Sequence, residues 1–231
     1  MRARILLADD HRLFIEGLAK LLTPNFEVIR MVTNGRELVA VATELIPDVI
    51  IADLSMPLLN GMEALRMLRR SGIRSKFVVV TVHADVSVAA EAFRSGASAY
   101  VLKQASGDEI HAAIAAALRG RTYLSSAFPV DLVTLLAEAV RRPYNGEPKL
   151  TRRQREVLQL VAEGKTMKEA ASLLNLSTRT VESYKYEIMN TLAVHTNAEL
   201  VQYAIRMGVI TVAPMHFAPP RPYSPEQNSQ S

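Results

Sequence analysis

Short apolar runs alternate with amphipathic stretches along residues 1–122. Because these runs are continuous rather than alternating, they predict strands buried on both faces, as in a parallel sheet covered by helices. The expected strands are residues 5–8, 26–29, 49–52, 77–80 and 100–102. The expected helices are residues 12–22, 35–45, 60–70, 86–94 and 107–119. This order predicts an α/β doubly wound domain with a five-stranded parallel sheet, flavodoxin-like in size.

The pattern changes after Gly120. One apolar helical stretch, 128–140, precedes a polar, turn-forming segment, so we expect residues 123–148 to be a linker with one helix. The tail, 213–231, is rich in Pro, Ser, Gln and Asn and is expected to be disordered. Between them, residues 149–212 predict a small all-α domain with helices over 151–162, 166–173, 178–192 and 196–207.

Six of the expected helices begin at a capping residue that is followed three places later by Glu or Gln. The capping residues are Asn34, Asn60, Ser106, Thr151, Thr166 and Thr196. These pairs fix the helix starts more firmly than apolar periodicity alone would.

Composition narrows the classes of protein that remain. The 231 residues are 49% hydrophobic and 22% charged, which is ordinary for a globular protein. There are no cysteines, so disulfides, zinc ribbons and thiol catalysis are excluded. No apolar run approaches the roughly 20 residues of a membrane helix, and the N-terminal run is too short for a signal peptide. We therefore expect a cytoplasmic protein with no membrane contact.

Positive charge is densest in the all-α region. The net charge is +4, and residues 149–212 contain nine basic and six acidic residues. This excess permits a polyanionic partner such as DNA without requiring one.

Polar residues follow four of the expected strands: Asp9 and Asp10, Asp53, Thr81, and Lys103. In a parallel sheet these carboxyl ends meet at one edge, where doubly wound folds bind ligands. Clustered carboxylates should recruit Mg²⁺, and a lysine and a hydroxyl can bind phosphoryl oxygens. Each residue alone is more often a cap or a surface residue. Together they predict phosphoryl transfer to a carboxylate, which forms an acyl phosphate.

These residues resemble a response-regulator receiver domain in the motifs Leu7-Ala-Asp-Asp10 and Asp53-Leu-Ser-Met-Pro57, with Asn60-Gly61, Thr81 and Lys103. The resemblance implies that Asp53 is the phosphoacceptor. It implies that Asp10 and Asp53 bind Mg²⁺ directly, Asp9 through water, and Ser55 through its carbonyl. It also implies that Thr81 and Lys103 bind the phosphoryl group while Tyr100 rotates inward. Arg12 and Gln104 depart from the usual pattern, away from the chemistry.

The helices at 166–173 and 178–192, joined by a tight turn, predict a helix-turn-helix. Val181, Ile188 and Leu192 form the expected buried stripe of the second helix. Its outer face fits the DNA major groove. We expect Arg179 and Lys185 to contact phosphates, Thr178 and Thr180 to add hydroxyl contacts, Glu182 to accept from a cytosine amino group, and Ser183 and Tyr186 to meet bases or sugars.

This region resembles a LuxR-type DNA-binding domain in the motifs Leu150-Thr-Arg-Arg-Gln-Arg-Glu-Val-Leu158, Glu163-Gly-Lys-Thr-Met-Lys-Glu-Ala170 and Leu176-Ser-Thr-Arg-Thr-Val-Glu182. With the receiver, it resembles the NarL/FixJ subfamily of response regulators. The resemblance implies dimers on paired half-sites, with the last helix presenting Glu199, Leu200, Tyr203 and Ala204. Tyr184 stands where His is frequent. Asn190-Thr191 stands where basic residues are usual, and this second change removes phosphate contacts, which predicts a modest DNA affinity.

The two regions together predict a two-component response regulator rather than an enzyme. A sensor histidine kinase would phosphorylate Asp53, double-stranded DNA would be the target, and the phosphorylated or DNA-bound form would be a homodimer. One alternative is a phosphohydrolase with Asp53 as nucleophile, but positions 55 and 57, where its second carboxylate would stand, are Ser55 and Pro57. Another is a receiver whose helical domain docks proteins; DNA binding that weakens steeply with salt would separate the two.

Overall fold

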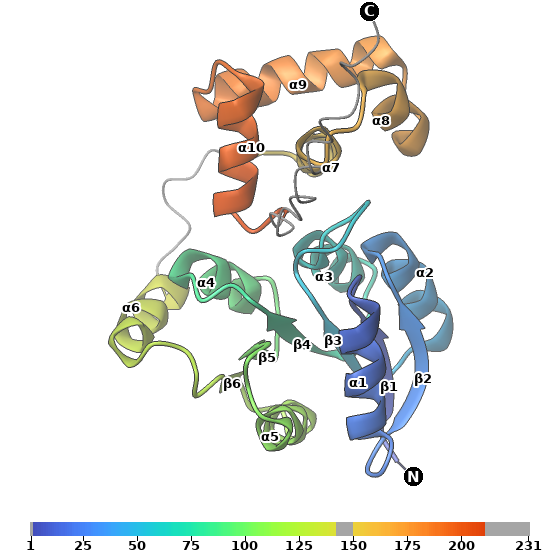
Figure 1. Cartoon of the computed structure of the whole chain (residues 1–231), viewed down its shortest axis with the longest axis vertical. Coiled ribbons are helices and arrows are strands. Elements are labelled where there is room, and N and C mark those ends of the chain that lie inside the picture. The colour runs from blue at the N-terminus through green and yellow to red at the C-terminus, as the bar shows by residue number, and fades with distance from the viewer. Residues whose placement is uncertain (1, 142–149, 211–231) are drawn as a thin grey trace, which may run out of the picture.

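The computed structural model describes residues 2–141 and 150–210 as an α/β domain (residues 4–141) and a helical domain (residues 150–210) beside it (Figure 1). The α/β domain contains one parallel sheet with strand order β2-β1-β3-β4-β5-β6. Its strands are β1 (Arg4–Ala8), β2 (Glu27–Val32), β3 (Val49–Ala52), β4 (Lys76–Thr81), β5 (Ala99–Leu102) and β6 (Tyr123–Leu124). The doubly wound parallel architecture expected from the sequence is confirmed.

The number of strands differs from the prediction, which was five. The sixth strand, β6, pairs in parallel with β5 through Ala99 opposite Tyr123 and Tyr100 opposite Leu124. Two half-buried residues are too few to produce a recognisable strand pattern in sequence. The first residues of the expected linker therefore belong to the sheet.

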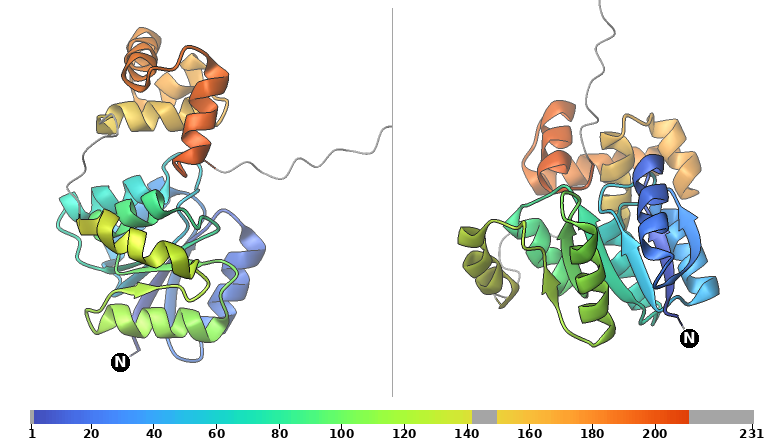
Figure 2. Two further views of the ribbon diagram at one scale, coloured as in Figure 1. Left: turned by 90° about the vertical axis from the view of Figure 1, so that its left-hand side faces the viewer. Right: turned by 60° about the horizontal axis from the view of Figure 1, so that its bottom comes forward.

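Helices cover both faces of the sheet (Figure 2). They are α1 (Arg12–Leu22), α2 (Gly35–Leu45), α3 (Gly61–Arg70), α4 (Val86–Arg94), α5 (Gly107–Leu118) and α6 (Val130–Arg141). One buried core joins the sheet to α1 and α5, and another joins it to α2, α3 and α4. This two-sided burial explains why the central strands are apolar throughout.

The helix α6, expected within the linker, packs against α4. Phe128 and Leu136 are buried there, and the ring of Phe128 meets Tyr100 edge-on with centroids 6.3 Å apart. We therefore group α6 with the α/β domain. The rest of the expected linker, 142–148, and the expected disordered tail, 213–231, lie outside the described residues.

The helical domain contains α7 (Arg152–Ala162), α8 (Met167–Leu174), α9 (Thr178–Leu192) and α10 (Asn197–Arg206). Reciprocal capping boxes begin α7, α8 and α10. In the α/β domain, Asn60 and Ser106 cap α3 and α5, but the glutamates three residues later do not complete a reciprocal capping box. Glu63 pairs with Arg66 and Arg155, and Glu109 accepts hydrogen bonds from the segment 125–126.

None of the helices within the described ranges, 2–141 and 150–210, has the length and apolar character that crossing a bilayer demands.

Candidate functional site

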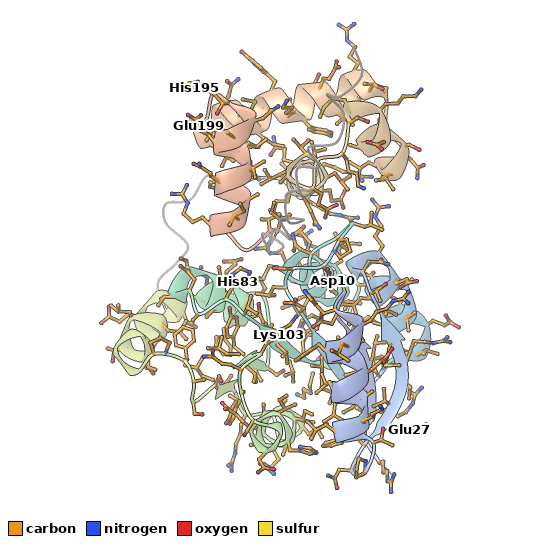
Figure 3. All side chains as sticks on the ribbon, viewed as in Figure 1. Asp10, Glu27, His83, Lys103, His195 and Glu199 are labelled. Atoms are coloured by element: carbon orange, nitrogen blue, oxygen red, sulfur yellow. The ribbon has the colours of Figure 1, made fainter. Side chains whose placement is uncertain are left out.

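The pairing of β1 with β3 places two of the predicted carboxylates beside each other. Ala8 lies opposite Ala52, and the Asp53 amide donates to the Ala8 carbonyl at 2.9 Å. Asp9 and Asp53, the next residues in each strand direction, therefore leave the sheet together at its carboxyl edge. Asp10 and Lys103 lie at this edge, which faces the helical domain (Figure 3).

Lys103 joins the two buried carboxylates. Its ammonium nitrogen lies 2.8 Å from Asp9 Oδ2 and 2.8 Å from Asp53 Oδ2, and its backbone amide donates to the Thr81 carbonyl. Burial by itself would lower the pKa of Lys103, but the carboxylates of Asp53 and Asp9 raise it above its ordinary value. The pocket thus has a fixed positive charge on one side of its carboxylates.

Asp9 is held in a less favourable environment. Its side chain is only 4% exposed, and this burial raises its pKa, although Lys103 and the His11 amide oppose the shift. A cation placed among these carboxylates would lower the cost of keeping Asp9 ionised.

The arrangement fits a hard divalent cation. Oxygen or nitrogen atoms of Asp9, Asp10, His11 and Asp53 all lie within 4.8 Å of one another. Asp53 Oδ1 is buried and has no hydrogen-bond partner among the residues that the structure describes. Carboxylate oxygens are the ligands that Mg²⁺ prefers. His11 was not among the predicted residues; its place directly after two acidic residues is the signal that could have found it.

The predicted switch residues surround a second histidine that the sequence analysis did not single out. His83 Nε2 lies 3.1 Å from Ser55 Oγ, and the His83 amide lies 3.4 Å from Thr81 Oγ1. The Tyr100 hydroxyl donates to the His83 carbonyl at 2.8 Å. Burial is the main cause that lowers the pKa of His83 and raises that of Tyr100. Thr81 and Tyr100 are fully buried, so both predicted switch residues already point inward.

The second candidate region is the outer face of α9, on the side of the helical domain away from the α/β domain (Figure 1). Val181 and Ile188 are fully buried and Leu192 is partly buried, as the stripe required. Of the residues predicted to contact DNA, the exposed ones are Thr178, Arg179, Glu182, Ser183 and Tyr186, and the half-buried ones are Thr180 and Lys185. Thr180 Oγ1 already bonds the capping Ser177 Oγ at 2.8 Å, so its hydroxyl is partly engaged.

The expected dimerisation surface needs correction. Leu200 and Ala204 are fully buried in the core of the helical domain, where α10 packs on α7, so neither presents a surface. The sequence pattern of α10 did not reveal which of its faces meets α7. Glu199 is exposed but caps its own helix, and half-buried Tyr203 lines a cavity between the two domains.

Contacts between the two domains form a further group that sequence reasoning missed. Gln159 and Arg155 lie on α7, and Glu163 directly follows it. The side chains of Gln159 and Glu163 accept hydrogen bonds from backbone amides after β3, and Arg155 forms an ion pair with Glu63 near the start of α3. Arg36 of α2 donates to the Leu173 carbonyl at 2.8 Å. Residues about a hundred positions apart in sequence give no local pattern from which such contacts could be predicted.

Comparisons with known proteins agree for both regions. Residues 5–115 match the family model of the response regulator receiver domain, and residues 148–204 match that of the bacterial regulatory proteins of the luxR family. The response regulator UvrY of Escherichia coli is 31% identical over 209 residues, which cover 89% of this chain and 94% of UvrY. The transcriptional regulatory protein LiaR of Bacillus subtilis is 36% identical over 209 residues, covering 90% of this chain and 99% of LiaR.

A solved structure of RcsB from Salmonella enterica serovar Typhimurium, bound to a promoter in the presence of the phosphomimetic BeF3−, is also similar. It is 26% identical and superposes with a TM-score of 0.60 over 88% of this chain and 98% of the RcsB chain.

Proposed function

Because the chain belongs to the NarL/FixJ subfamily of response regulators, whose two domains serve phosphorylation-controlled transcription, we propose that Asp53 is the residue that becomes phosphorylated. The α/β domain is the receiver domain, and the helical domain is the DNA-binding domain. One observation carries the proposal: Asp53 Oδ1 is buried without a hydrogen-bond partner among the described residues, in a cluster with Asp9 and Asp10.

The reaction is transfer of a phosphoryl group from a sensor histidine kinase or a small phosphodonor. An Asp53 carboxylate oxygen forms a bond to phosphorus while the bond from phosphorus to the donor breaks, and the donor keeps that electron pair. Lys103, already 2.8 Å from Asp53 Oδ2, pairs with a phosphoryl oxygen. The Thr81 hydroxyl donates to another phosphoryl oxygen, and Tyr100, which is already buried, needs no inward rotation.

Mg²⁺ bound in this pocket would neutralise the phosphoryl oxygens as charge develops on them. Asp10 and Asp53 would bind it directly, Asp9 through water, and Ser55 through its backbone carbonyl. The unpartnered Asp53 Oδ1 supports this set, because a buried carboxylate oxygen without a donor is costly unless a cation meets it.

The output is DNA binding by the outer face of α9 in a major groove. Arg179 and Lys185 are assigned to phosphate oxygens and Glu182 to a cytosine amino group. Thr178, Thr180, Ser183 and Tyr186 are assigned to the remaining base, sugar or phosphate contacts. The relative RcsB was solved on a promoter with a phosphoryl mimic, which supports the pairing of these two activities here. We expect a homodimer on paired half-sites.

The test of phosphorylation uses full-length wild type and Asp53→Asn, a change that keeps the shape of the side chain. With radiolabelled acetyl phosphate and Mg²⁺, wild type should take up label and Asp53→Asn should take up none. Omission of Mg²⁺ should also abolish labelling. Equal labelling of the variant would mean that another carboxylate is the acceptor.

A mobility-shift assay with a pool of genomic fragments tests the output. Phosphorylated wild type should retain a subset of fragments, and the complex should weaken steeply as salt rises. If neither the phosphorylated nor the unphosphorylated protein retained any fragment, the DNA-binding proposal would be wrong.

A further inference from the structure

The DNA-binding domain bonds directly to the loop that follows Asp53. Gln159, on α7, is 1% exposed, and its Oε1 accepts a hydrogen bond from the Asn60 amide at 2.8 Å. Its Nε2 donates to the Met56 carbonyl at 2.8 Å. One buried side chain of the DNA-binding domain therefore ties together the two ends of a receiver loop through backbone groups, and Asn60 Nδ2 adds a further hydrogen bond to Gln159 Oε1 at 3.3 Å.

The tip of this loop is held by the same domain. The Leu58 amide donates to Glu163 Oε1 at 3.2 Å, and Glu163 in turn accepts from Gln159 Nε2 at 2.7 Å. Leu58 has a φ of 67°, a left-handed conformation that non-glycine residues rarely adopt. Its side chain packs against the core of the DNA-binding domain. The contacts with the DNA-binding domain thus offset the backbone strain at Leu58, which would otherwise favour another loop conformation.

A movement of this loop should displace the Asp53 backbone, because the residues that follow the loop pack directly against it. The Gly61 amide donates to the Leu54 carbonyl at 2.8 Å. A Cβ atom on Gly61 would lie 2.1 Å from the Asp53 carbonyl oxygen, so the start of α3 sits directly against the phosphoacceptor backbone. Ser55, whose carbonyl is a proposed Mg²⁺ ligand, directly precedes the loop.

We propose that Gln159 is a positioning residue for the phosphoacceptor site, supplied by the DNA-binding domain. It holds residues 56–60 in the loop geometry of the unphosphorylated receiver, so docking of the domains and occupation of the Asp53 site oppose each other. The inference rests on the proposed function of Asp53. A coupling between two binding events is reciprocal, so if a phosphoryl group weakens docking, docking weakens phosphoryl binding by the same factor.

The experiment measures the affinity of the full chain for BeF3− in the presence of Mg²⁺, by isothermal titration calorimetry and by the fluorine NMR signal of bound BeF3−. Gln159→Met keeps the volume and apolar packing of the side chain but removes its hydrogen bonds to the loop. We expect it to bind BeF3− about fivefold or more tightly than wild type, the lower range of measured couplings. General damage to the fold would weaken binding, so a tighter complex reports release of the loop. Gln159→Ala should shift the affinity in the same direction.

Arg36→Ala is the matched control. It removes another hydrogen bond between the domains, to the Leu173 carbonyl, and that bond does not involve residues 56–60. Its affinity for BeF3− should stay within about twofold of wild type, below the usual range of couplings. Equal tightening by Arg36→Ala would overturn the assignment to Gln159, since any loosening of the interface would then suffice.

Unchanged or weaker binding by both Gln159 variants would also overturn the inference. That failure is distinct from failure of the proposed function. If wild type bound no BeF3− and Asp53 took up no label, the phosphoacceptor itself would be wrong; if wild type bound BeF3− and the Gln159 variants matched it, only the role of Gln159 would be wrong.

Discussion

The phosphoacceptor pocket and the outer face of α9 are built in opposite ways. In the pocket, Asp9 and Asp53 are 4% and 3% exposed, and a single ammonium group bonds both. On α9 the side chains proposed to contact DNA are mostly exposed, and Tyr186 is 69% exposed. One region is a buried network of charges, and the other is a row of side chains directed at solvent.

The difference shows in which region the fold itself holds charges close together before any ligand binds. In the pocket, the fold already holds charges together in a low-dielectric environment, so removing one group leaves the others uncompensated. On α9, the charges are solvated and cost little, so each gains its energy only on contact with DNA. Changes in the pocket should therefore alter stability, and changes on α9 should alter binding alone.

The largest effect should follow from Lys103→Met. The variant leaves two buried carboxylates facing each other without their cation, and breaking such a buried pair costs about 3–5 kcal/mol. Urea unfolding of the receiver domain should show this loss, and millimolar Mg²⁺ should restore part of it because the metal replaces the missing charge. Lys20→Met, at an exposed position of α1, is the control and should change stability by less than about 0.5 kcal/mol. Equal stabilities would show that the pocket is not a charge network.

The next effect in size is a loss of DNA affinity in Arg179→Ala. Removal of an exposed phosphate contact should weaken binding to all fragments by about 1 kcal/mol or more and reduce the salt slope by about 0.9. The free energy of unfolding should hardly change. Arg119→Ala removes the same charge from an exposed end of α5 and should leave both the affinity and the slope as they are. A large loss of stability in Arg179→Ala would contradict the contrast between the regions.

Much of the pocket could be predicted because strand ends are local signals. Asp9, Asp53 and Lys103 each follow an apolar run, and the topology of a parallel sheet brings such positions together. The helix starts were equally accessible, because a cap and its partner lie three residues apart. The recognition face followed from helical periodicity, since Val181 and Ile188 define what remains outside.

The features that could not be predicted depend on packing between distant segments. Whether the apolar face of Leu200 meets a partner chain or the core of its own domain is decided by where α7 lies, because an apolar stripe on α10 fits either. Gln159 looks like any polar residue of an amphipathic helix until the receiver loop is placed against it. His83 is a single histidine two residues beyond a strand, and only the positions of Ser55 and Tyr100 show that it belongs to the site.

Double-mutant cycles sharpen the comparison with a smaller effect. In the pocket, Asp9→Asn combined with Lys103→Met should depart from additivity by about 0.5–3 kcal/mol in unfolding free energy, because the two groups are bonded. On α9, Arg179→Ala and Tyr186→Ala lie seven residues apart, roughly 10 Å along the helix. Their effects on DNA-binding free energy should add within about 0.5 kcal/mol. Additivity in the pocket, or strong coupling on α9, would erase the distinction.

The smallest effect concerns pH, where Glu199 of the DNA-binding domain and Asp9 of the receiver should contribute with opposite signs. Glu199 accepts hydrogen bonds from the His195 and Thr196 amides at 2.6 and 3.1 Å, and these bonds lower its pKa from an ordinary 4.5. A lowered pKa means that its stabilising contribution is complete above about pH 4.5 and is lost as pH falls through the folded-state value. Asp9 contributes with the opposite sign. Burial raises its pKa above 3.8, so its ionised form lowers the stability of the folded receiver.

Unfolding followed against pH, without Mg²⁺, separates these contributions. Glu199→Gln should flatten the decline in stability of the DNA-binding domain below pH 4.5, because glutamine accepts the same amide bonds without titrating. In the wild-type receiver, protonation of the Asp9 carboxyl should stabilise the fold as pH falls through its raised pKa. Asp9→Asn should remove this gain in stability. If both substitutions changed the pH profiles in the same direction, burial would not distinguish the pocket from the exposed helices. The opposite signs follow from geometry alone: amide donors surround the exposed Glu199 carboxylate, whereas the buried Asp9 carboxylate shares one lysine with Asp53.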